Sequence, residues 1–393
     1  MHFTPLDKQQ RAEWRGMLNP ADGAHIGAAA ALFFLSALVI PLSYIEAVSG
    51  LYLLYAAVFY YMLTHSAGSL IAIALPGVAL FAVSGFAPGL PSLYTLPAVY
   101  AALVLGGIGG GFLLIHCRER RYLALLALPV AAFAIACAVA GPLAALLVLI
   151  PTALSLVLGH AMCNCRPQTP VLVTLGGVLA ASGVIAYLIW YAAKGWPEAN
   201  PFAYLGELVR AGIARVLDEA AALYAQQGVE LALSATDVHN VGALLGNTLV
   251  GFFLAACGVL AFLIFRTYLR VLTAWNTLSR VPLRIGAMTV SPIAAGLFLF
   301  SYIAGAFASG GVFGTVCENL SIVLQPALVL VGVGALMGKP GGKRSKFSTA
   351  LLIVALLLLF NYPSLALLLA ATVGAIRILL AAFAMRGKRE DNK

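Results

Sequence analysis

The chain has 393 residues, of which 62% are hydrophobic and only 9% are charged, and its mean hydropathy is +0.99. Soluble domains carry about 25% charged residues, so this composition excludes a soluble globular fold and fits a lipid bilayer as solvent. The formal net charge of +9 is dispersed into short clusters between apolar runs. A nucleic-acid-binding protein would gather that charge on one stripe, so nucleic acid is not expected as a partner.

The first 23 residues are polar and form an N-terminal segment. No Ala-x-Ala site closes a short apolar run there, so no cleavable signal is expected and the first apolar run is predicted to be an uncleaved anchor.

The apolar runs predict an all-α polytopic membrane protein, because a spanning helix needs roughly 20 apolar residues. Two runs, 49–64 and 347–361, are short and either could be re-entrant, so the prediction is about twelve spans, with ten as the lower bound. The twelve runs divide into an N-terminal membrane half, 24–193, and a C-terminal half, 241–385. They are 24–44, 49–64, 67–85, 95–116, 122–140, 142–162, 171–193, 241–265, 288–309, 312–337, 347–361 and 363–385.

Five basic clusters predict the orientation. With the N-terminus inside and alternating spans, all five fall on the inner side, as the retention of Lys and Arg in the cytoplasm requires. Both termini are then cytoplasmic, residues 386–393 form a basic cytoplasmic tail, and the expected location is a bacterial cytoplasmic (inner) membrane whose anionic lipid is a partner. The clusters are Lys8–Arg15, Arg118–Arg121, Arg266–Arg284, Lys339–Lys346 and Arg386–Lys393.

One long polar segment, 194–240, is predicted to lie outside the membrane. Apolar residues recur every three or four positions across Phe202–Gln227, which is typical of an amphipathic helix, and Gly228 stands where a helix commonly ends. This extracytoplasmic helix is either a lid over a substrate entrance or a connector packed on the outer rims of its neighbours.

Small residues gather on two spans. The glycine-rich run in 95–116 follows no strand and precedes no acidic partner, so a dinucleotide site is not expected and no cofactor is predicted. Such faces let helices pack closely, or let a partner membrane subunit dock. The candidate residues are Ala24, Gly27, Ala28, Ala31, Gly106, Gly107, Gly109, Gly110 and Gly111.

Four polar residues at membrane depth form the candidate intramembrane site. Arg377 lies nine residues before Arg386, about 13 Å of helix from the inner end. Glu318 and Asn319 lie on the tenth span with Gln325 further along it, so either a Gln325–Arg377 hydrogen bond or a Glu318–Arg377 ion pair is expected. A buried ion needs a partner in a structural role and in a substrate site alike, so both readings stay open.

No catalytic or metal-binding motif accompanies these residues. The sequence lacks H-E-x-x-H, G-x-S-x-G and a P-loop, so no catalytic residues are predicted and an ATPase motor in this chain is excluded. The lone Cys163-Asn-Cys165 is weak as a metal site, and structural cysteines are expected. Three histidines, His65, His116 and His160, lie at predicted inner ends of spans. A solvated residue at the membrane surface is a simpler interpretation of each than a proton relay.

The order of features from residue 241 onward resembles the YybS-like family of predicted bacterial integral membrane proteins. A span enters Phe265–Arg270, and then come Trp275, Arg280-Val281-Pro282, Glu318–Leu324, Gly332, a basic loop, Pro363 and a last span with Gly374. The N-terminal half is loosely similar to the substrate-binding membrane components of energy-coupling-factor vitamin transporters. The resemblance implies a transport-like or ligand-binding role, although Arg377 stands near a position where the family tends to carry an acidic residue.

These observations favour a transporter-like protein that binds or translocates a small solute of unknown identity without its own ATPase. The alternative is a membrane scaffold or regulatory protein that works through membrane or cytoplasmic partner subunits. A membrane enzyme acting on lipid ranks third, because no polar cluster converges at one interface.

Overall fold

The computed structural model describes residues 7–43, 95–116, 122–197, 200–226, 235–286, 288–308, 311–337, 354 and 362–390. All regular structure within these ranges is helical. The chain divides into two compact units, and each is described by itself. The larger unit comprises 2–246 and 260–287, and the smaller comprises Met1, 247–259 and 288–393.

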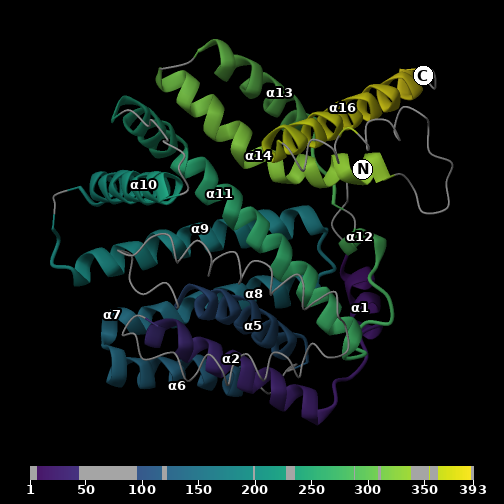
Figure 1. Ribbon diagram of the computed structural model, residues 1–393. Helices are drawn as coiled ribbons and strands as arrows, with labels where there is room; N and C mark the ends of the chain where they lie inside the picture. Colours follow the sequence, from purple (N-terminus) through teal and green to yellow (C-terminus); the bar gives the residue numbers. More distant parts are fainter. Residues whose placement is uncertain are drawn as a thin grey trace. The chain divides into compact units, whose positions relative to one another are not determined.

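The larger unit contains most of the helices (Figure 1). They are α1 (Lys8–Gly16), α2 (Gly23–Ser43), α5 (Thr95–His116), α6 (Tyr122–Ala140), α7 (Pro142–Ala145), the 3₁₀ helix η1 (Leu146–Val148), α8 (Leu149–Cys163), α9 (Gln168–Ala193), α10 (Pro201–Gln226), the two ends of α11 (Ala235–Ala274) and α12 (Leu283–Gly286). The smaller unit contains the middle of α11, α13 (Pro292–Phe307), α14 (Val312–Met337) and α16 (Pro363–Glu390).

Among the described residues, six helices are long and apolar enough to cross a membrane. They cover Gly23–Leu42, Pro142–Cys163, Gln168–Ala192, Gly246–Ala274, Val312–Leu336 and Ser364–Ala384. Three shorter apolar helices, Ala102–His116, Leu126–Ala140 and Pro292–Phe307, fall on further predicted spans. The predicted spans 49–64, 67–85 and 347–361 lie outside the described residues, apart from Val354.

Several predicted boundaries agree with the structure to within a residue. Helices α5 and α6 begin and end as the runs 95–116 and 122–140 predict, and α10 covers the predicted amphipathic stretch. The clearest difference is α11, a 40-residue helix where the sequence predicts a span over 241–265. Hydropathy detects only the apolar middle of a helix, whereas the polar ends of α11 are equally able to continue the helical hydrogen bonds.

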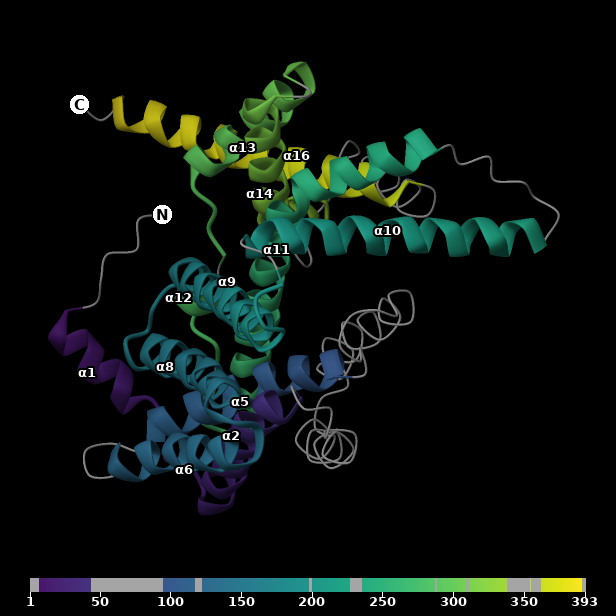
Figure 2. The ribbon, with the colours of Figure 1, turned by 90° about the vertical axis from the view of Figure 1, so that its left-hand side faces the viewer.

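The core of the larger unit is built on α5, which lies between α2 and α8 in both views (Figures 1 and 2). The glycines of α5 allow this arrangement. A Cβ atom on Gly109 would lie 2.6 Å from the carbonyl oxygen of Ala29, and one on Gly106 would lie 2.8 Å from the Cβ atoms of Ser36 and Pro151. The three backbones therefore approach more closely than any residue with a side chain would permit.

In the smaller unit, α14 crosses both α13 and α16. Five fully buried side chains form its core: Ala295, Phe298, Leu328, Ala371 and Ala375. Gly332 and Gly374 face each other across the α14–α16 crossing, where a Cβ atom on either glycine would collide with the backbone of the other helix. Small residues at a crossing let dispersion contacts between backbones replace the hydrophobic driving force that is absent in lipid.

Candidate functional site

The side chain of Asn319 joins α14 to the backbone of α11 in the smaller unit. Its Oδ1 accepts a hydrogen bond from the backbone N–H of Gly251 at 2.5 Å, and its Nδ2 donates to the carbonyl oxygen of Asn247 at 2.7 Å. In a regular α-helix those two backbone groups would bond to each other. The Asn319 carboxamide therefore bonds to both members of one backbone N–H and C=O pair of α11. A third hydrogen bond, from Nδ2 to the Thr315 carbonyl oxygen at 2.8 Å, fixes its orientation.

The other three residues of the predicted intramembrane site are not joined in the structure. Arg377 is exposed on α16, whereas Glu318 and Gln325 are half-buried on α14. Neither the predicted Glu318–Arg377 ion pair nor the Gln325–Arg377 hydrogen bond is formed among the described residues. The side chain of Glu318 lies instead against Gly305 of α13, with Cγ 3.6 Å from where a Cβ atom on that glycine would be.

The two predicted small-residue faces occupy different environments. Gly106, Gly107, Gly109, Gly110 and Gly111 are all buried within the larger unit, against α2, α8 and α11. The small residues of α2 point elsewhere: Ala24, Gly27 and Ala31 are exposed and Ala28 is half-buried. The buried face of α2 is the one that carries Ala29, Leu32, Phe33 and Ser36.

Predicted inner segments meet at one end of the larger unit. Asn19 donates through Nδ2 to the carbonyl of Asn276 at 2.7 Å, and His116 Nε2 lies 3.3 Å from the Thr277 hydroxyl. The ring of Trp275 stacks on His25 at 4.9 Å between centroids and meets Phe112 edge-on at 4.6 Å. The N-terminal segment, the end of α5 and the loop after α11 therefore share one end of the larger unit.

Helix α1 is attached to this end through α8. The indole Nε1 of Trp14 donates to the carbonyl of Met162 at 2.7 Å, and Nε of Arg15 donates to the carbonyl of Cys163 at 3.0 Å. Both acceptors are last-turn carbonyls, which have no partner within their own helix. A cation at a helix C-terminus also interacts favourably with the helix dipole.

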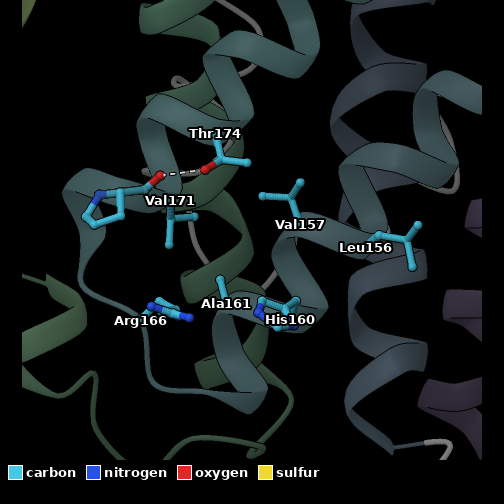
Figure 3. A pocket seen from close by; sticks show the side chains of 8 residues that line it. Leu156, Val157, His160, Ala161, Arg166, Val171 and Thr174 are labelled. Atoms are coloured by element: carbon cyan, nitrogen blue, oxygen red, sulfur yellow. Dashed lines mark hydrogen bonds between the residues drawn. The ribbon is translucent and has the colours of Figure 1, made fainter. Parts of the chain in front are cut away.

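A groove of about 510 Å³ lies between α8 and α9 at the same end. It is lined by Leu156, Val157, His160, Ala161, Arg166, Pro170, Val171 and Thr174. Figure 3 shows Val157 and Val171 on opposite walls, with His160 and Arg166 together at one end of the groove. The walls are apolar and no carboxylate lies among the lining residues.

The basic end of the groove is available to a ligand. Arg166 is exposed, and within the described residues its guanidinium forms no hydrogen bond or ion pair. Within the described ranges, the ring nitrogens of His160 have Asn164 as their one hydrogen-bond partner, with Asn164 Nδ2 3.3 Å from Nδ1. The Thr174 hydroxyl does not serve as a donor to a ligand, because it donates to the carbonyl of Pro170 at 2.9 Å (Figure 3). The groove can therefore recognise an anion attached to an apolar body.

Cys165, the residue before Arg166, is buried. Burial raises the pKa of the Cys165 thiol, and the charge of Arg284 lowers it by a smaller amount. The free thiol therefore stays protonated near neutral pH. Within the described ranges, no three His, Cys, Asp or Glu side chains come together in a group able to hold a metal ion.

Sequence reasoning missed the groove: it placed His160 at an inner end but did not single out Arg166. Arg166 falls in the predicted loop 163–170 but outside the five basic clusters, and His160 reads as a rim residue. The periodicity of apolar residues describes the faces of one helix, and it does not show which side chains of a neighbouring helix lie opposite. A groove between two helices is therefore not visible in the sequence.

No protein-family model, curated protein or solved structure matches this chain.

Proposed function

We propose that the chain is a multi-pass membrane protein that binds a small anionic, amphiphilic solute in the α8–α9 groove, and that it acts as a transporter-like protein without its own ATPase. The observation that carries the proposal is Arg166 beside His160 at the end of an apolar groove of about 510 Å³, with no partner for its guanidinium among the described residues. Ligand sites are commonly clefts of about 300–1,000 Å³ with apolar walls and a few well-placed polar groups.

The proposed topology places the ligand. The N- and C-termini are cytoplasmic, and the basic loops lie on the inner side of a bacterial cytoplasmic membrane. Residues 164–167 connect two candidate spans, so Arg166 stands at the membrane surface when both helices cross. The groove then opens at the cytoplasmic surface and rises along α8 and α9. The YybS-like resemblance of the second half points to the same class of membrane protein.

The polar residues of the smaller unit have a structural role in this proposal. Asn319 is fully bonded to the α11 backbone and the Thr315 carbonyl, so it has no free donor for a solute. Arg377 is exposed on a helix apolar enough to span. A long Arg side chain in that position reaches toward the lipid headgroups, which removes the need for a buried partner.

A binding measurement tests the proposal. The purified protein in neutral detergent is titrated with alkyl phosphates and alkyl carboxylates of increasing chain length, and its thermal stability is recorded. We expect stabilisation that grows with chain length and is lost in Arg166→Gln. The control Arg270→Gln removes an exposed charge from α11, outside the groove, and keeps the response. No stabilisation by any anion, or an equal response in both variants, contradicts the proposal.

A further inference from the structure

The groove between α8 and α9 has the dimensions and chemistry of a phospholipid site. Its length follows from its lining: from Leu156 to the end of α8 at Cys163 is seven residues, roughly 10 Å at 1.5 Å per residue. It therefore reaches from the membrane surface into the outer part of the hydrocarbon, the depth at which the glycerol esters and first methylenes of a lipid lie.

The surroundings of the groove favour entry from the bilayer. Leu156, a lining residue, is 54% exposed, and Leu149 and Val173 on the same two helices are 58% and 71% exposed. Both helices are candidate spans, so these apolar side chains face lipid when the helices cross. A lipid chain already lies beside these side chains and can enter the groove from the bilayer, whereas a soluble metabolite would enter at the cytoplasmic mouth.

The charges at the mouth select the headgroup. Arg166 presents a planar guanidinium that can bond a phosphate through two parallel N–H groups, and His160 lies beside it (Figure 3). Helix α1 brings further positive charge to the same end of α8 because Arg15 is bonded to the Cys163 carbonyl. Basic pockets between spanning helices on the cytoplasmic side are known binding sites for anionic headgroups.

We infer that the α8–α9 groove binds one anionic glycerophospholipid from the inner leaflet, with the phosphate on Arg166 and His160 and the start of an acyl chain between Val157 and Val171. The inference rests on the proposed function and narrows its ligand from any amphiphilic anion to a membrane lipid. It also gives the protein a route by which its ligand reaches the site, through the plane of the bilayer.

Native mass spectrometry of the full chain in neutral detergent tests the inference. Palmitoyl-oleoyl phosphatidylglycerol and the corresponding phosphatidylcholine are added at equal concentrations, and glycerol 3-phosphate and inorganic phosphate form two soluble arms. We expect one tight phosphatidylglycerol per chain, preferred over phosphatidylcholine, and no competition from either soluble phosphate.

Three variants locate the site. Arg166→Gln is expected to weaken phosphatidylglycerol binding by about five- to tenfold, the effect of one basic residue at an anionic surface. Val171→Trp fills the groove while leaving both charges, and should reduce binding of lipid with either headgroup. The matched control Arg270→Gln should bind as the wild type does. Size-exclusion profiles establish that each variant remains folded.

The outcomes separate the inference from the function on which it rests. Equal binding of the two lipids, or unchanged binding in Arg166→Gln, overturns the lipid assignment. Displacement of the lipid by glycerol 3-phosphate or inorganic phosphate also overturns it, but leaves a soluble anion as the ligand and the proposed function intact. If, in addition, the alkyl anions fail to stabilise the protein, the proposed function fails as well.

Discussion

At the scale of single residues, the best-defined feature is the pairing of Asn319 with α11. The carboxamide both donates and accepts, so it can satisfy the N–H of Gly251 and the carbonyl of Asn247 together. Close approach is a precondition, because a Cβ atom on Gly251 would lie 2.8 Å from Oδ1 and 2.9 Å from the backbone Cα of Asn319. One residue supplies the hydrogen bonds and the other supplies the space.

Replacing Asn319 with Leu should lower the stability of the protein by about 1 kcal/mol, a typical cost for an interhelical hydrogen bond in a membrane. The cost arises because the new side chain fills similar space but bonds to neither backbone group. Unfolding by added SDS in mixed micelles measures it. Gln325→Leu, on the same helix and without a partner among the described residues, is the matched control and should change stability much less. Equal effects of the two substitutions would show that the Asn319 contacts contribute nothing specific.

Gly251→Ala should destabilise by about 1–3 kcal/mol, the usual range for overpacking, since the atoms in the way include backbone that cannot rotate aside. Gly258 provides the control within α11, because a Cβ atom there would meet nothing within 4 Å. Gly258→Ala should be neutral or slightly stabilising, as the higher helix propensity of Ala predicts. The same SDS titration compares the two, and a Gly251→Ala protein as stable as Gly258→Ala would contradict the close approach.

At the scale of elements, glycine position distinguishes helix faces that the sequence pattern leaves equivalent. Gly332 and Gly334 are two residues apart on α14. The first lies against the α16 backbone and the second is exposed with open space around it. Gly332→Ala should therefore loosen the α14–α16 crossing and lower stability by about 1–3 kcal/mol. Gly334→Ala should not lower the stability. If Gly334→Ala were the more destabilising of the two substitutions, the crossing would lie on the opposite face of α14.

Helix α1 provides a second test at this scale. Trp14→Ala removes the bond to the Met162 carbonyl together with a buried ring, so α1 should detach from α8 more often. Arg11 and Arg15 would then be cut faster by trypsin in the detergent-solubilised protein, which gel electrophoresis over time detects. Met17→Ala is the control, because that side chain is 66% exposed and cannot hold the helix in place. Equal cleavage rates in the two variants would show that α1 is held by something other than Trp14.

At the scale of the whole molecule, the sequence predicts helices well and their partners poorly. The apolar runs locate α5 and α6 to the residue because each run ends at polar or turn-forming positions. The same signal misses the length of α11, whose ends are polar. Likewise, the sequence singles out Asn319 as an unusual polar residue, but hydropathy and spacing within α14 cannot show that its partner is the backbone of α11.

The groove between α8 and α9 is likewise formed by contacts between helices that the sequence does not predict. His160 and Arg166 are readable as basic residues near a predicted membrane surface, yet their importance depends on Val171 facing Val157 across two helices (Figure 3). The predicted topology puts the basic loops on one side of the membrane, which stays a prediction. It does not determine which of these residues stay unpaired, since that depends on side-chain contacts such as the bond between Arg15 and Cys163.

The central claim is that this end of the larger unit lies on the cytoplasmic side of a membrane that the helices cross. Single cysteines at Gly16 and Pro197, both exposed, test it most directly when placed in a cysteine-free variant and treated with a membrane-impermeant maleimide in intact cells. We predict that the cysteine at 197 is labelled in intact cells and that the cysteine at 16 is labelled only after permeabilisation. Labelling of position 16 in intact cells, or equal labelling of both positions, would contradict the account.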